Sequence, residues 1–98
     1  MKIVWTVEAA DDLANVLDYF AHRSPAGATS VASAIAATTT SISQFPHAGR
    51  MDPETGCRER LVERYPLLLI YAAGADVVEI IALFHTSRDP VTKRRAQP

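Results

Sequence analysis

A chain of 98 residues can build one hydrophobic core, and this length excludes a protein of several independent domains. Hydrophobic residues make up 48% and charged residues 21%, a balance that is typical of a globular domain and excludes intrinsic disorder. The formal net charge of -1 excludes a globally basic protein that would hold nucleic acid through its overall field.

The one cysteine, Cys57, excludes an internal disulfide and a cysteine-based metal cluster, and we expect neither a metal nor a cofactor. A single cysteine also favours a reducing, cytoplasmic setting. The first residues, MKIVWT, are followed by acidic residues and are not a signal peptide. The longest apolar run, PLLLIYAAGA, is far too short to span a bilayer, so the sequence predicts no membrane partner.

The chain begins with a short β-prone stretch, KIVW at 2–5, which predicts a first strand. Thr6 is a suitable N-cap for a helix that continues to about Arg23, with Glu8 near its start where the helix dipole favours anions. Apolar residues recur along this helix at helical spacing: Ala9, Leu13, Val16, Leu17 and Phe20. These features predict an amphipathic helix.

Ser24 and Pro25 predict both the end of this helix and the start of another, with Ser24 as the cap and Pro25 in the first turn. The second helix carries an apolar stripe of Val31, Ile35, Ile42 and Phe45, with Thr38 in its gap. Because the joint between the helices is so short, we expect an antiparallel helical hairpin.

Residues 46–57, PHAGRMDPETGC, are rich in turn-forming residues and predict a loop. Strand candidates follow at 58–65, 67–73 and 77–85, joined by connections short enough for an antiparallel meander. The predicted order is β-α-α-β-β-β, an α+β fold with a helical hairpin on one face of a small, mainly antiparallel twisted sheet. We expect a single domain over 1–90 and a flexible basic tail over 91–98.

The last two strands are apolar on both faces, which a single layer of helices does not explain. Alternation of period two places Val78, Ile80, Ala82 and Phe84 on one face of the final strand. It places the following residues on the second face of the two strands: Leu67, Leu69, Tyr71, Ile81 and Leu83. We expect a partner protein to cover this second face. The alternative is that the chain itself covers both faces.

Basic residues mark two further surfaces. Arg58, Arg60 and Arg64 alternate along one face of the polar strand, where they form either a ladder toward an acidic partner or a solvated edge. The last strand ends in LFHTSRDP, which contains His85 and Arg88. His85 is either a contact residue or a structural histidine bonded to nearby backbone.

One ordered set of residues runs through the chain: Trp5-Thr6, Ala9, Asp12-Leu13, Tyr19, Phe45-Pro46, Gly49-Arg50, Arg58, Leu61, Tyr65-Pro66, Ile70-Tyr71, Val78-Glu79-Ile80, His85 and Arg88-Asp89. With this set the chain resembles the ParE branch of the RelE/ParE superfamily, the toxins of bacterial toxin–antitoxin pairs. The resemblance covers residues 3 to 90 and depends on the order of these parts.

The resemblance implies a compact toxin that a ParD-like antitoxin neutralises by wrapping it with a C-terminal segment, in a complex that can be a larger hetero-oligomer. ParE-like members are similar to inhibitors of DNA gyrase, and RelE-like members look like ribosome-dependent mRNA endonucleases. For antitoxin binding we single out the apolar second face together with two arginines: Leu67, Leu69, Tyr71, Ile81, Leu83, Arg58 and Arg60.

RNA cleavage needs a base, an acid and cations around the phosphate. The chain has only two lysines, Lys2 and Lys93, and a slightly negative net charge, which argues against docking into ribosomal RNA. The sequence therefore favours a non-enzymatic gyrase inhibitor whose target contacts include His85, Arg88 and Arg50. If the toxin is instead a nuclease, its candidate catalytic residues are His85, Arg88, Arg50 and His47.

Overall fold

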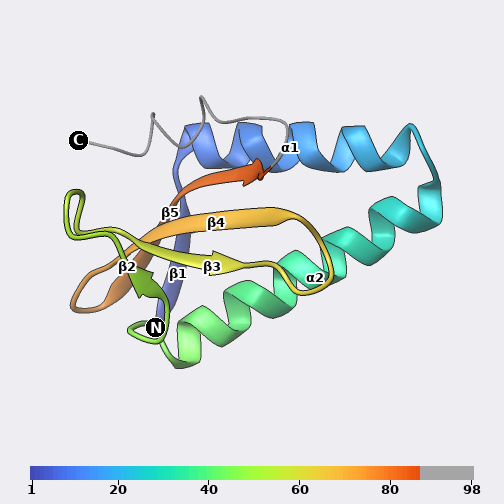
Figure 1. Cartoon of the computed structure of the whole chain (residues 1–98). Helices are drawn as coiled ribbons and strands as arrows, with labels where there is room; N and C mark the ends of the chain where they lie inside the picture. Colours follow the sequence, from blue (N-terminus) through green and yellow to red (C-terminus); the bar gives the residue numbers. More distant parts are fainter. Residues whose placement is uncertain (87–98) are drawn as a thin grey trace.

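The computed structural model describes residues 1–86, so Arg88 and the predicted basic tail lie outside the described residues (Figure 1). The elements, in chain order, are β1 (Lys2–Trp5), α1 (Val7–Ala21), α2 (Pro25–Gln44), β2 (Arg50–Met51), β3 (Arg58–Leu61), β4 (Leu67–Ala73) and β5 (Val77–His85). The strands form one sheet in the order β1-β5-β4-β3-β2. β1 runs parallel to β5, and the other pairs are antiparallel. The predicted α+β fold is confirmed, with the short edge strand β2 as an addition inside the expected loop.

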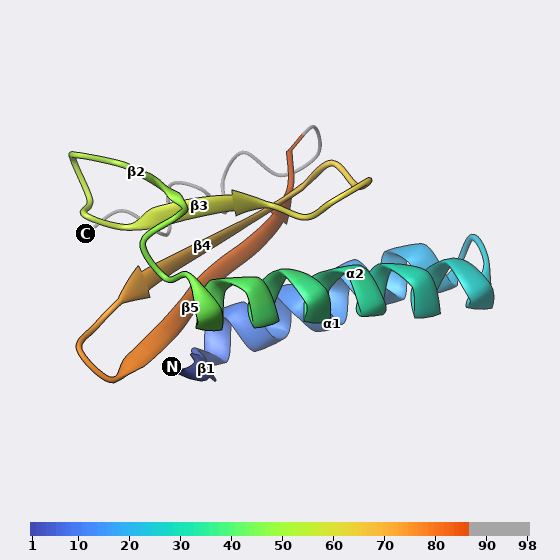
Figure 2. The same ribbon diagram turned by 90° about the horizontal axis from the view of Figure 1, so that it is seen from below.

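Both helices lie on the same side of the sheet, as Figure 2 shows. Thr6 caps α1 by accepting a hydrogen bond from the backbone N–H of Ala9, and Ser24 caps α2 by accepting one from Gly27. The capping residues and the helical hairpin predicted from the sequence are therefore confirmed. Within residues 1–86, neither helix is long and apolar enough to cross a membrane.

The stripe predicted for α2 packs into the core for most of its length. Val31, Ile35 and Ile42 are buried, and Thr38 fills the gap between them while its hydroxyl donates to the carbonyl of Ala34. The prediction fails at the end of the stripe, where Phe45 caps the helix and its side chain is 63% exposed. Because α2 ends at Gln44, helical spacing no longer determines where the side chain of Phe45 points. The turn that begins at Phe45 determines it instead.

The assignment of the two sheet faces was wrong. Leu67, Leu69, Tyr71 and Leu83 lie in the core between the sheet and the helices, where each is at most 1% exposed. The register shifts between Ile70 and Tyr71, so that one residue of β5 is left without a direct partner. Beyond this β-bulge the alternation of β5 is reversed, because an extra residue moves the following side chains to the opposite face.

The sheet face away from the helices carries its own apolar cluster of Cys57, Ile70, Ala82 and Phe84, all of them buried. Leu68 and Ile81 pack against this cluster and are partly exposed. The prediction that both faces are apolar is therefore correct. However, the residues predicted for the outer face, apart from Ile81, belong to the helix-facing core.

The polar strand is shorter than predicted. β3 ends at Leu61, and the chain then turns so that the N–H of Val62 donates to the carbonyl of Leu67 over 3.0 Å. Arg64 lies in this turn with a φ of 74°. Arg58 and Arg60 remain neighbours on one strand face, but Arg64 does not continue the expected row.

Candidate functional site

The polar end of β5 is positioned by α1. β1 ends at Trp5, so the part of β5 beyond Ile80 has no strand on that side. The carboxylate of Asp12 accepts a hydrogen bond from the backbone N–H of Leu83 over 3.1 Å. Asp12 is only 8% exposed, and this bond satisfies a buried strand donor that would otherwise be costly. α1 therefore replaces the missing strand neighbour and fixes the residues that lead to His85.

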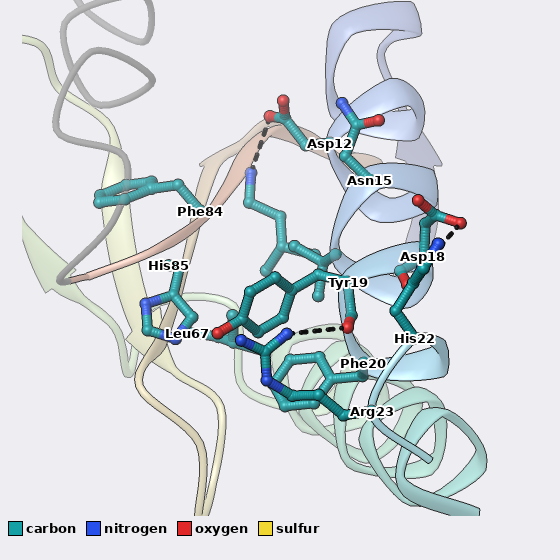
Figure 3. A pocket seen from close by; sticks show the side chains of 12 residues that line it. Asp12, Asn15, Asp18, Tyr19, Phe20, His22, Arg23, Leu67, Phe84 and His85 are labelled. Atoms are coloured by element: carbon teal, nitrogen blue, oxygen red, sulfur yellow. Dashed lines mark hydrogen bonds and ion pairs between the residues drawn. The ribbon is translucent and has the colours of Figure 1, made fainter. Parts of the chain in front are cut away.

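A cavity of about 500 Å³ opens between α1 and the end of β5 (Figure 3). It is lined by Asp12, Asn15, Val16, Asp18, Tyr19, Phe20, His22, Arg23, Leu67, Leu83, Phe84 and His85. The lining is mixed, with apolar side chains from the core and ionisable side chains from α1. Of the residues singled out in the sequence as target contacts, His85 lies in this cavity.

His85 lies against an aromatic ring that carries a cation on its face. The rings of His85 and Tyr19 meet edge to face, with centroids 5.9 Å apart and planes at 61°. The guanidinium of Arg23 lies 3.7 Å from the centre of the same Tyr19 ring and also donates to the Tyr19 carbonyl over 3.3 Å. An imidazole, a phenol and a guanidinium are therefore close together, and such groups can transfer protons and bind anions.

The second group of predicted contacts, His47 and Arg50, lies in the segment between α2 and β3. The guanidinium of Arg58 donates to the carbonyls of His47 over 3.1 Å and Gly49 over 3.0 Å. The hydroxyl of Tyr71 donates to the carbonyl of Pro46 over 2.9 Å. The side chains of His47 and Arg50 are exposed, while the backbone between them is held from inside the protein.

His85 lies far from the segment that carries His47 and Arg50. His85 pairs with Leu67, whereas Arg50 pairs with Glu59, which in turn pairs with Ile70. Arg50 is therefore three strands across and three residues along from His85, a backbone separation of about 17 Å from standard strand spacings. The structure does not bring His85 together with Arg50. Arg88, the fourth nuclease candidate, lies outside the described residues.

The residues singled out for antitoxin binding fall into two classes. Leu67, Leu69, Tyr71 and Leu83 are core residues, so the argument from an uncovered face does not apply to them. Arg58 and Arg60 are partly exposed and hydrogen-bonded, with Arg60 donating to the Ser41 hydroxyl over 2.9 Å. Ile81 is partly exposed on the outer face. Within residues 1–86, no group of three or more His, Cys, Asp or Glu residues could hold a metal ion.

Sequence reasoning missed three features: the contact of Tyr19 with Arg23, the contact of Tyr19 with His85, and the exposure of Phe45. The spacing of four residues between Tyr19 and Arg23 could have indicated their contact on one helix face. Their contact with His85 could not be found in the same way, because it depends on how α1 crosses β5. The exposure of Phe45 was missed because it was counted with the buried stripe of α2.

Residues 3–90 match the family model described as "ParE toxin of type II toxin-antitoxin system, parDE". The chain belongs to the ParE toxin family. Among relatives, this ParE-family chain is 29% identical over 87 residues to Toxin RelE2 of Caulobacter vibrioides, covering 89% of this chain and 97% of the relative. It also shares its fold with a solved chain of the chromosomal ParDE TA system from P. aeruginosa. That match has a TM-score of 0.77 and 24% identity, and it covers 87% of this chain and 95% of the other. The protein is thus a toxin of a type II toxin–antitoxin system, as the ordered residues of the sequence predicted.

Proposed function

We propose that this toxin arrests growth by inhibiting DNA gyrase and not by cleaving mRNA. The observation that carries the proposal is the separation of the predicted nuclease residues, since His85 and Arg50 are about 17 Å apart along the sheet. Acid–base cleavage of RNA needs its groups within hydrogen-bond reach of one phosphate. The small number of lysines and the net charge of -1 support the same choice.

We further propose that a ParD-like antitoxin neutralises the toxin by direct binding, in the cytoplasm and without a cofactor. Membership of a two-component toxin–antitoxin family supports such a partner. The partly exposed rim of the outer sheet face, at Leu68 and Ile81, offers apolar surface to it. Arg60 at the edge of the sheet offers a cation to an acidic segment. Assembly of toxin and antitoxin into a larger hetero-oligomer belongs to this proposal.

The experiment that tests the proposal compares two reactions with the same purified toxin. We expect the toxin to block DNA supercoiling by gyrase and to leave cell-free translation unaffected. Adding the antitoxin encoded next to the toxin gene should restore supercoiling. Blocked translation together with unaffected supercoiling would refute the proposed target.

The second candidate function is a ribosome-dependent mRNA endonuclease. Two observations favour it: the identity to a relative named Toxin RelE2, and the close approach of His85, Tyr19 and Arg23 beside one cavity. Those three groups include a proton donor or acceptor and a phosphate-binding cation. If this candidate holds, His85→Gln should abolish mRNA cleavage in the translation assay while the variant still folds.

A further inference from the structure

The segment between α2 and β3 has a conformation that the protein fixes from inside (Figure 1). Tyr71 is fully buried, and its hydroxyl holds the carbonyl of Pro46. Arg58 holds two more carbonyls, those of His47 and Gly49. Gly49 itself is buried against the Tyr71 hydroxyl and the Glu59 carbonyl, where a side chain has no room. The backbone from 46 to 49 is thus held by the buried Tyr71 and the partly exposed Arg58, although the segment lies at the surface.

This fixed segment presents unusually apolar side chains to solvent. Phe45 at its start is 63% exposed, and Met51 at its end is 49% exposed. His47 and Arg50 between them are also exposed, and residues 45–51 contain no acidic side chain. Met51 pairs with Arg58, which pairs with Tyr71, so Met51 lies on the helix-facing side of the sheet. Phe45 is the C-cap of α2. Arg50 pairs with Glu59 opposite Ile70, so it lies on the other side of the sheet from Met51.

Such a surface has the composition of a protein interface. Aromatic residues and methionine are enriched where proteins contact one another, and a few well-packed residues supply most of the binding free energy. A loop that is already held in one conformation loses little entropy when it binds. The internal hydrogen bonds of the segment serve that purpose, since they restrict the backbone without covering Phe45 or Met51.

We propose that residues 45–51 are the docking surface with which the toxin holds its protein target, and that Phe45 and Met51 are its anchors. The partner that fits this surface is a folded protein with an apolar pocket that takes Phe45 and Met51. Exposed side chains on a fixed loop insert into a pocket, which a folded target offers and a wrapping antitoxin segment does not. The inference rests on the proposed function, in which this target is gyrase.

The test replaces both anchors at once and includes a control that removes two other exposed apolar side chains. Phe45→Ala/Met51→Ala is compared with Val7→Ala/Leu61→Ala, whose original side chains are 75% and 65% exposed at other places. We expect the anchor variant to need at least about tenfold more toxin for half-inhibition of supercoiling. The control variant should stay within about twofold of the unmodified toxin, and all three proteins should have the same thermal midpoint and the same affinity for the antitoxin.

The outcomes separate this inference from the proposed function. If the unmodified toxin leaves gyrase active, the proposed function fails and the inference fails with it. If the unmodified toxin inhibits gyrase and the anchor variant inhibits equally well, only the inference is wrong. Loss of antitoxin binding with intact inhibition would assign the segment to the antitoxin. A gel shift of DNA by the unmodified toxin alone, lost in the anchor variant, would assign it to DNA; either result overturns the inference.

Discussion

Gly49 is the position where one added methyl group tests both the fold and the fixed segment. A Cβ at this position would overlap the hydroxyl of Tyr71, and it would lie 3.0 Å from the carbonyl oxygen of Glu59 and 3.1 Å from Cζ of Tyr71. The carbonyl belongs to β3 and cannot move without disturbing the sheet. Gly49→Ala must therefore displace Tyr71, and the displacement breaks its hydrogen bond to Pro46.

The loss of stability follows from these contacts. Overpacking a well-filled site costs about 1–3 kcal/mol, and a lost hydrogen bond costs about 1 kcal/mol. Alanine restricts the unfolded chain more than glycine does, which returns about 0.5–1 kcal/mol. The expected net loss for Gly49→Ala is about 2–3 kcal/mol, and for a domain of this size it corresponds to a fall in Tm on the order of 10–20 °C.

Urea denaturation of four proteins measures the effect: the unmodified toxin, Gly49→Ala, Tyr71→Phe and the double variant. Because Tyr71→Phe removes the hydroxyl, Gly49→Ala should cost about 1 kcal/mol less in that background. Gly27→Ala in α2 is the matched control, since a Cβ there meets Ser24 Cβ at an ordinary 3.5 Å and should not destabilise. A Gly49→Ala variant as stable as the unmodified toxin would refute the packing argument, and equal costs in both backgrounds would refute the role of the hydroxyl.

Four other substitutions have expected results. Leu69→Ala should lower the free energy of unfolding by about 2–5 kcal/mol because this side chain is fully buried, whereas Leu61→Ala, 65% exposed, should change it by less than about 0.5 kcal/mol. Equal effects in urea denaturation would contradict the corrected sheet faces. Thr6→Ala should cost about 1 kcal/mol by removing the cap of α1, and an unchanged urea midpoint would argue against the cap. Asp12→Ala should cost about 1–3 kcal/mol and speed amide exchange at Leu83, whose N–H loses its acceptor; unchanged exchange there would rule out this bond in solution.

The local parts of the fold could be predicted from the sequence because local chemistry determines them. Thr6 and Ser24 cap their helices with side-chain oxygens that act over three residues, and Pro25 restricts only its own turn. The strand segments and their order followed from residue type and short connections in the same way. β2 was missed because its two residues lie inside a segment rich in turn formers.

The sequence could not show which face of the sheet packs against the helices, because either set of alternating apolar residues could have formed that face. β4 is apolar on both faces, so the alternation of its residues was correct while the choice of the helix-facing set was not. In β5 the bulge beside Ile81 reverses the alternation, and no local signal marks it, since the surrounding residues are all apolar. The same limit applies to His85, whose neighbour Tyr19 comes from α1.

Tyr71 shows how this correction changes the interpretation of function. From the sequence it was a partner contact, but the structure makes it a core residue whose hydroxyl holds the segment that carries the proposed anchors. Replacing Tyr71 by a small residue would empty the core and release that segment together, so a loss of inhibition could not locate the target surface. Phe45 and Met51 are free of this ambiguity because they are exposed and their removal leaves the core intact. The proposed target surface must therefore be tested with these exposed residues, and Tyr71→Phe serves only to measure how much the fixed conformation contributes.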